Sequence, residues 1–276
     1  MRSLLFASVL SVFSGAALLA QTRAAASGPS PLVIGETFTI DSRVLGETRR
    51  INVYAPAVSA DSVRLPVLYM PDGGMAEDFL HIAGLVQISV ANGTMRPFLL
   101  VGIENTQRRR DLTGPTENEE DRKIAPVVGG SEAFRRFIRT ELMPEVRARY
   151  RTTDETAIVG ESLAGLFVVE TFFLEPDLFD TYIAFDPSLW WNDQRLLGSA
   201  APSLRARPRH GERLYLASSK NEIAALTQRL ARVLEESGFP GDHLFYQSLP
   251  NETHATIYHP AALQAFRQLF KPPAQP

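Results

Sequence analysis

Short apolar runs that alternate with helical patterns constrain the fold of this chain more than any other feature. The runs 66–70 and 97–103 are nearly continuous in apolar residues, which is typical of strands buried on both faces of a sheet. Segments 79–90 and 163–174 carry helical spacing between such runs. Strands that alternate with helices predict a mostly parallel sheet with helices on both faces, and therefore one α/β domain.

The rest of the chain fits this pattern. Residues 33–40 and 49–54 predict an antiparallel hairpin at a sheet edge, joined by a turn at Gly46. A polar segment at 104–130 is expected to be a long loop, and loops of that length in a compact domain are usually functional or mobile. Further strands are expected at 156–159, 182–185, 213–217 and 244–249, and further helices from 131 and at 223–236 and 261–270.

Composition excludes several classes of function. Of the 276 residues, 45% are apolar, which is enough for a sizeable core. The net charge of −3 argues against a nucleic-acid partner, because nucleic-acid binders usually carry a basic excess. The chain has no cysteine, which excludes disulfides, thiolate metal sites and a cysteine nucleophile. We find no H-E-x-x-H motif and no cluster of His and Asp, so we expect neither a metal nor another cofactor.

The N-terminus has the layout of a secretory signal. A basic start at residues 1–3 precedes an apolar run at 4–20, and the small residues 24–26 offer a cleavage site after Ala26. We therefore predict a signal peptide at 1–26 and a single mature domain at 27–276. The alternative is an uncleaved membrane anchor. Since no second long apolar run follows, we expect no membrane association after cleavage. An exported chain without cysteine favours a bacterial periplasmic or secreted location.

The strongest local motif is Ile158-Val-Gly-Glu-Ser-Leu-Ala-Gly165. A buried strand leads into a turn of small residues with Ser162 at its apex, and a helix follows at once. This pattern is typical of a nucleophile elbow, in which the serine hydroxyl is exposed on a sharp strand-to-helix turn. Ala164 stands where the usual pattern has glycine. The alternative is an ordinary connection in which the serine only caps the helix.

A serine nucleophile needs a general base, which is usually histidine. Catalytic groups in open parallel sheets gather at the carboxyl ends of the strands. His254 follows the last expected strand and is the predicted base, with His259 as the alternative. Glu222, after the strand at 213–217, is the predicted acid that orients the imidazole; Asp186, which ends the preceding strand, is held in reserve. A glutamate that opens a helix can also simply complement the helix dipole.

The remaining candidate residues would bind the substrate. An oxyanion hole needs two backbone N–H donors, and we predict Leu163 for one and Gly73 or Gly74 for the other, although the glycines also fit a plain turn. Two arginines and two tryptophans follow other strand ends. Arg108 and Arg110 could clamp a carboxylate or catecholate, and one of Trp190 and Trp191 could stack on an aromatic acyl group. A solvated basic loop and core packing are the competing interpretations.

Five ordered motifs carry a resemblance to a known family. They are LPVLYMPDGG at 65–74, VGIENTQRRRDLT at 101–113, GESLAG at 160–165, FDPSLWWND at 185–193, and the loop around His254. In this order the chain resembles the α/β-hydrolase family named “Putative esterase”, which includes esterase D, feruloyl esterases and enterobactin-type siderophore esterases. The resemblance implies an α/β-hydrolase fold with Ser162 as nucleophile and His254 as base. It leaves open whether an acid takes part or the site is a Ser–His dyad.

We therefore expect an exported serine hydrolase that cleaves carboxylic esters through an acyl-enzyme intermediate. Its substrate would be a small-molecule ester of the siderophore polyester type; a feruloyl or acetyl carbohydrate ester, or acyl transfer to a sugar hydroxyl, are the alternatives. A hypothesis of another class is a non-catalytic binding protein on a hydrolase scaffold. We expect a monomer or weak oligomer.

Overall fold

The computed structural model describes residues 29–58, 63–207, 211–220 and 222–273. The predicted signal peptide at 1–26 lies outside these residues. Contacts divide the chain at Ile34, and all helices and strands belong to the compact unit that begins there. Within the described ranges, the helices are too short or too polar to cross a membrane.

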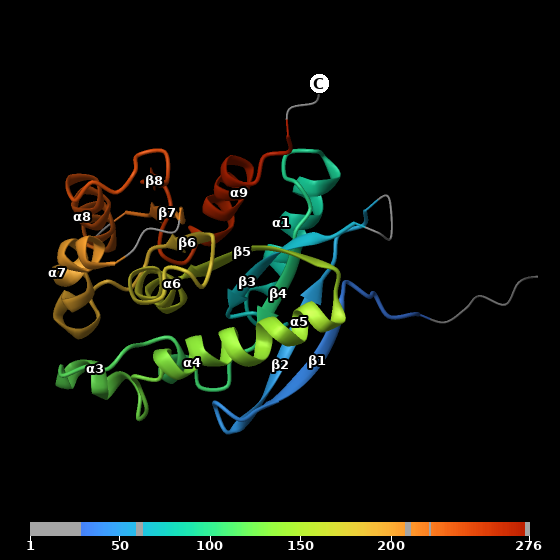
Figure 1. Ribbon diagram of the computed structural model, residues 1–276, viewed down its shortest axis with the longest axis horizontal. Coiled ribbons are helices and arrows are strands. Elements are labelled where there is room, and N and C mark those ends of the chain that lie inside the picture. The colour runs from blue at the N-terminus through green and yellow to red at the C-terminus, as the bar shows by residue number, and fades with distance from the viewer. Residues whose placement is uncertain (1–28, 59–62, 208–210, 221, 274–276) are drawn as a thin grey trace, which may run out of the picture. The chain divides into compact units, whose positions relative to one another are not determined.

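An eight-stranded sheet forms the centre of this unit (Figure 1). Its strands are β1 (Glu36–Ser42), β2 (Glu47–Tyr54), β3 (Leu65–Pro71), β4 (Leu99–Ile103), β5 (Thr152–Glu161), β6 (Thr181–Phe185), β7 (Arg213–Ser218) and β8 (Leu244–Ser248), in the order β1-β2-β4-β3-β5-β6-β7-β8. β2 pairs antiparallel with β1 and β4, and all other pairs are parallel. The predicted parallel sheet with an antiparallel pair at one edge is confirmed.

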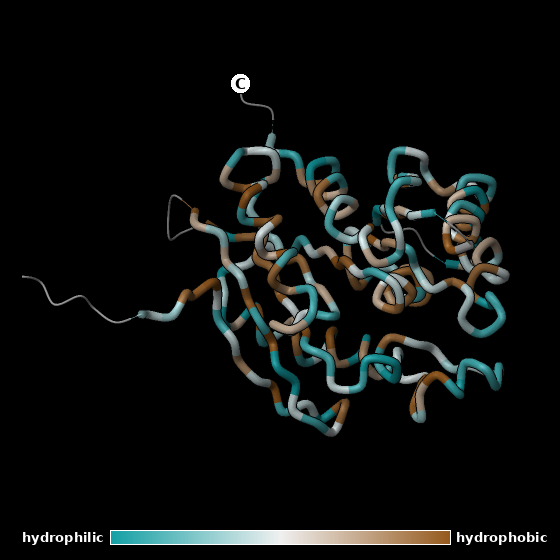
Figure 2. The backbone as a smooth tube through the Cα atoms, turned by 180° about the vertical axis from the view of Figure 1, so that it is seen from behind, coloured by the Kyte–Doolittle hydropathy of each residue, from teal (hydrophilic) through white to brown (hydrophobic). Residues whose placement is uncertain are grey.

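Helices cover both faces of the sheet because successive strand residues point to opposite sides. Leu68 and Met70 face one core with α1 (Phe79–Ala91) and α9 (Tyr258–Leu269), which pack together (Figure 1). Val67 and Tyr69 face the other core. That core is covered by α4 (Ser131–Phe137), a π-helical turn (Ile138–Leu142), α5 (Met143–Arg149), α6 (Leu163–Leu174), α7 (Trp191–Ala206) and α8 (Glu222–Glu236). Along the outer helices, hydrophobic residues alternate with hydrophilic ones, as expected for helices with one buried side (Figure 2).

Two segments differ from the sequence prediction. The loop expected at 104–130 contains two short helices, α2 (Arg108–Asp111) and α3 (Glu119–Ile124). Helix α7 was not predicted. It is polar on average, contains Pro202, and begins with three residues in left-handed backbone conformation, Asn192 to Gln194, so its sequence carries only a weak helical pattern.

The parallel strands bring several loops to one edge of the sheet. β5, β6, β7 and β8 are neighbours, so the segments that follow their carboxyl ends lie side by side. Those segments carry Ser162, Asp186, Ser219 and His254. This edge is where the sequence analysis expects the site.

Candidate active site

Ser162 sits on a sharp turn between β5 and α6. Its backbone has φ 61° and ψ −120°, a conformation that costs free energy for a residue with a side chain and persists only where its surroundings enforce it. The Ser162 amide donates to the Phe185 carbonyl at 3.0 Å, and the Ser162 carbonyl accepts from the Leu166 and Ser188 amides at 2.9 and 3.1 Å. Hydrogen bonds on both sides therefore hold the strained turn in place.

Small residues make this turn possible. A Cβ added to Gly160 would lie 2.6 Å from the carbonyl carbon of Ala164, so the strand end and the first helical turn approach too closely for any other residue. Ala164 itself is fully buried. The methyl group at the position where the usual motif has glycine is thus accommodated, and the geometry matches the predicted elbow.

The structure brings His254 to Ser162 from a loop 92 residues further along the chain. His254 Nε2 lies 3.0 Å from Ser162 Oγ. The His254 side chain keeps 44% of its surface exposed, so the pair opens to solvent and to any ligand. His259, the alternative base, lies on α9 with its ring 5.7 Å from that of His81.

The carboxylate hydrogen-bonded to His254 is that of Asp186. Asp186 Oδ2 lies 3.2 Å from His254 Nδ1, and the Asp186 side chain is completely buried. Ser219 holds this carboxylate with two hydrogen bonds, from its amide to Oδ1 at 2.7 Å and from its hydroxyl to Oδ2 at 2.6 Å. A hydrogen on Nδ1 leaves Nε2 with the lone pair that a base needs.

Asp186, the alternative acid, therefore lies beside His254 Nδ1, the position that was predicted first for Glu222. Glu222 begins α8, and its side chain lies outside the part of the chain that the structure describes. Asp186 is favoured by topology, because β6 lies between β5 and β7 and its carboxyl end meets both the elbow and Ser219. Asp186 has φ 39°, which turns the chain sharply at this strand end.

A second carboxyl group, Glu161, also lies beside the imidazole. Glu161 Oε1 is 3.1 Å from His254 Nδ1, and only 16% of the Glu161 side chain is exposed. Burial raises the pKa of Glu161 to about 8 against the opposing effect of His254. The pKa of His254 is raised chiefly by its hydrogen bond to Asp186, with partial burial acting in the opposite direction.

One atom each of Glu161, Asp186 and His254 lie within 4.8 Å of one another, a grouping that a metal ion could in principle use. Asp186 Oδ2 already accepts from the Ser219 hydroxyl, and His254 Nδ1, the ring nitrogen that faces both carboxyl groups, is hydrogen-bonded to Asp186. These contacts fit an arrangement for proton transfer.

The predicted oxyanion donors differ in availability. Leu163 is the first residue of α6, where an amide has no acceptor within the helix, so its N–H remains available beside Ser162 Oγ. The two glycine amides are occupied: that of Gly73 donates to the Ile103 carbonyl at 3.0 Å, and that of Gly74 donates to Glu77 Oε2 at 2.7 Å. Neighbouring acceptors hold both amides in this conformation, so a glycine donor to the oxyanion stays a prediction that requires one of these hydrogen bonds to open.

The two predicted substrate arginines are bound to carboxylates of the protein itself. Arg108 makes a bidentate ion pair with Asp72, at 2.6 and 2.7 Å. Arg110 pairs with Glu47 at 2.7 Å and with the buried Asp111 at 2.7 Å. Arg110 is therefore part of an internal ion-pair cluster. Both guanidinium groups have carboxylate partners within the protein, and a substrate-binding role for either arginine stays a prediction.

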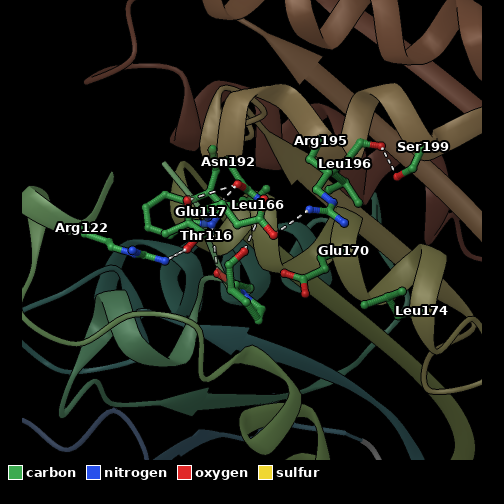
Figure 3. Close-up of a pocket in the computed structure, with 13 residues that line it drawn as sticks. Thr116, Glu117, Arg122, Leu166, Glu170, Leu174, Asn192, Arg195, Leu196 and Ser199 are labelled. Atoms are coloured by element: carbon green, nitrogen blue, oxygen red, sulfur yellow. Dashed lines mark hydrogen bonds and ion pairs between the residues drawn. The ribbon is translucent and has the colours of Figure 1, made fainter. Parts of the chain in front are cut away.

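A cavity of about 570 Å³ opens along α6 (Figure 3). Leu166, Glu170 and Leu174 line it from one side of the helix, and Leu166 is one turn, about 5.4 Å of rise, beyond Ser162. Residues 114–117 of the predicted functional loop form another wall. The lining includes Leu166, four residues after Ser162, but not Ser162, Asp186 or His254 themselves.

Of the two tryptophans, only Trp191 lines the cavity. Its side chain is almost fully buried, and its indole Nε1 donates to the Gly114 carbonyl at 3.0 Å. Trp190 is 37% exposed and is not part of the cavity lining. One of the pair therefore faces a cavity, and its stacking on an acyl group stays a prediction.

Sequence reasoning missed Glu161 and Ser219 as parts of the site. The sequence did contain a feature that could have indicated each residue. Glu161 is a charged residue that follows the apolar run 157–159 and Gly160 at the end of β5, and Ser219 is a small donor directly after β7. Their partners come from other strands, so the contacts themselves could not be read locally.

Known proteins share this architecture. The family described as “Putative esterase” matches residues 42–238. The ferri-bacillibactin esterase BesA of Bacillus subtilis is 31% identical over 182 residues, which cover 59% of this chain and 61% of that protein. The siderophore triacetylfusarinine C esterase of Aspergillus fumigatus is 34% identical over 194 residues, or 62% of each chain. The match therefore spans about three fifths of the length of each of these two relatives.

A solved structure agrees over more of the chain. The IroE-like serine hydrolase from Shewanella oneidensis superimposes with a TM-score of 0.76 and 28% sequence identity, covering 86% of this chain and 80% of that one. Together with the strand order, this likeness shows an α/β-hydrolase fold.

Proposed function

The chain belongs to the “Putative esterase” family, and from this premise we propose that it is a serine hydrolase that cleaves carboxylic esters. The observation that carries the proposal is the 3.0 Å contact between Ser162 Oγ and His254 Nε2, on a serine held at φ 61°. A strained, partly exposed serine with an imidazole in hydrogen-bond reach is what nucleophilic catalysis requires.

The reaction follows from the geometry. Ser162 Oγ attacks the ester carbonyl carbon and its proton passes to His254 Nε2, while the Leu163 amide donates to the oxyanion. The C–O bond to the alcohol breaks, and His254 returns the proton to the leaving alkoxide. A water molecule then repeats the two steps on the acyl-enzyme, which releases the acid and restores Ser162. Asp186 keeps the hydrogen on Nδ1 and stabilises the imidazolium in both halves.

The second oxyanion donor requires a local change. Gly74 can donate to the substrate only when its amide is released by Glu77. Glu77 lies within hydrogen-bond distance of the Asn105 side-chain amide at 3.0 Å, so that carboxylate keeps a partner if it leaves Gly74.

A labelling experiment tests the nucleophile. The wild-type protein should react covalently with a fluorophosphonate probe and hydrolyse p-nitrophenyl acetate, while Ser162→Ala should do neither and His254→Ala should label far more slowly. Ser237→Ala provides a matched control, a Ser-to-Ala change just after α8 that should label normally. A wild-type protein that is folded but neither labels nor hydrolyses would favour the binding-protein hypothesis.

For the substrate, we propose an ester of the siderophore type. Support comes from the two relatives named as siderophore esterases and from a cavity of about 570 Å³ whose lining includes Leu166, four residues after Ser162. Cavities of this size accommodate a drug-sized molecule or one arm of a larger one. Arg108 and Arg110 are already paired with Asp72 and Glu47. The cavity wall combines apolar side chains, such as those of Leu166 and Trp191, with the cationic side chains of Arg122 and Arg195.

A substrate panel separates the alternatives. Initial rates would be compared for a catecholate trilactone and a hydroxamate ester siderophore, each with and without ferric iron, and for feruloyl and acetyl sugars. We expect kcat/KM for at least one siderophore to exceed those for the sugars by tenfold or more. Equal low values would exclude the siderophore proposal, and a faster sugar ester would favour the carbohydrate esterase alternative.

We also propose that residues 1–26 direct export of the protein from a bacterial cell. The support is the basic start, the apolar run and the small residues before Ser27. N-terminal sequencing of the protein recovered from the periplasm of an expressing bacterium should begin at Ser27. Recovery of the full-length chain from the membrane fraction would favour the anchor.

A further inference from the structure

The Nδ1 edge of His254 meets two carboxyl groups where a Ser–His–Asp site needs one. Asp186 Oδ2 is 3.2 Å away and Glu161 Oε1 is 3.1 Å away. Asp186 is satisfied by Ser219, whereas Glu161 Oε1 is buried and makes no hydrogen bond. Glu161 is also fixed in place, because it ends β5 and precedes the strained Ser162 directly.

The surroundings of Glu161 carry several other charges. Five titratable groups interact electrostatically with Glu161. They are His254 after β8, Asp186 after β6, Arg108 of α2, Asp78 before α1, and the phenol of Tyr258 at the start of α9. Arg108 is held by Asp72, so its charge is largely compensated. His254 is therefore the group to which the charge state of Glu161 matters most.

We propose that Glu161 is a positioning residue of the hydrolase, which shares the Nδ1 edge of His254 with Asp186 and stabilises the imidazolium formed when Ser162 gives up its proton. This inference rests on the proposed function. The proton of Ser162 Oγ moves to Nε2 and the hydrogen on Nδ1 stays, so the ring gains one positive charge between two carboxyl groups. An ionised Glu161 lowers the energy of that charged ring, and a neutral Glu161 does so much less.

The sign of the pH effect follows. Burial raises the pKa of Glu161 to about 8, so at neutral pH its carboxyl group is mostly protonated. As the pH rises, loss of the proton from His254 makes the ring a base, although the hydrogen bond to Asp186 raises the pKa at which this occurs. Ionisation of Glu161 near pH 8 adds a second negative charge beside the ring. Because the two groups interact, the steps belong to the pair rather than to either residue.

The test is the pH dependence of kcat/KM for p-nitrophenyl acetate between pH 5.5 and 10, with the rate of Ser162→Ala subtracted. We expect two rises for the wild-type protein, the second near pH 8 and about tenfold, which is the effect of about one pKa unit on the imidazole. Glu161→Gln should show only the first rise, and Glu161→Asp should restore the second. Glu141→Gln is a matched control: Glu141 is also half-buried but bonds only the turn after β1, so both rises should persist.

A wild-type profile with one rise, or a second rise that survives in Glu161→Gln, would overturn the role of Glu161 while leaving the hydrolase intact. A lower melting temperature of Glu161→Gln with an unchanged two-step profile would also overturn it, because Glu161 would then be structural only. If the wild-type protein neither labels nor hydrolyses at any pH, the proposed function fails and this inference fails with it.

Discussion

Asp186→Asn tests which acid serves His254. In the wild-type protein, Oδ1 accepts from the Ser219 amide, and Oδ2 accepts from the Ser219 hydroxyl and from His254 Nδ1. The single oxygen of asparagine must stay with the Ser219 amide, because that donor cannot be reversed. The new NH₂ group then faces the Ser219 hydroxyl, which can rotate, and His254 Nδ1.

This arrangement reverses the tautomer of the imidazole. Nδ1 has to accept from the NH₂ group, so the ring hydrogen moves to Nε2, and Nε2 can no longer accept the proton of Ser162. In a serine triad, such a loss of the correct tautomer lowers kcat by about 10⁴-fold. At 1.36 kcal/mol per factor of ten, this corresponds to about 5 kcal/mol of transition-state stabilisation.

The assay is kcat/KM for p-nitrophenyl acetate at pH 7.5, together with the rate of fluorophosphonate labelling and the melting temperature. Glu222→Gln, measured in parallel, should stay within about threefold of the wild-type protein. The assignment of Asp186 would be refuted if Asp186→Asn folded normally and kept a tenth of the activity. It would also be refuted if Glu222→Gln lost a thousandfold.

Two further predictions concern the cavity and the ion-pair cluster. Ser199→Trp places a large side chain in the cavity from α7. This change should raise KM for a siderophore-sized ester by about tenfold and leave kcat/KM for p-nitrophenyl acetate unchanged. An unchanged KM for the large ester would show that the cavity does not bind substrate. Burial alone would raise the pKa of Glu47, but hydrogen bonds from Arg110 and Thr106 outweigh it and lower that pKa to about 2. Glu47 therefore stabilises the fold above pH 4.5, and this contribution is lost as the pH falls towards 2. Urea unfolding of Glu47→Gln should show a deficit of about 1–3 kcal/mol at pH 6 that shrinks at pH 3, and an equal deficit at both pH values would contradict this.

The order of strands and helices, and the place of the elbow, were determined by local sequence. The continuous apolar runs of β3 and β4 and the helical pattern of α6 are properties of each segment by itself. Gly160 and Ser162 could be interpreted for the same reason, since the crowding that demands glycine arises only four residues away, at Ala164. Helix α7 escaped prediction because its polar sequence, Pro202 and left-handed start weaken that local pattern.

Only the tertiary structure decided which polar groups meet. Asp186 and Glu222 both come near strand ends, and the position of β6 between β5 and β7 selects Asp186 as the partner of His254. The structure also decides the partners of the other predicted site residues. The Gly73 amide bonds Ile103 and the Gly74 amide bonds Glu77. Arg108 pairs with Asp72, and Arg110 pairs with Glu47. A segment's pattern reveals what it buries, whereas the partner of a charge depends on how all the segments are arranged in space.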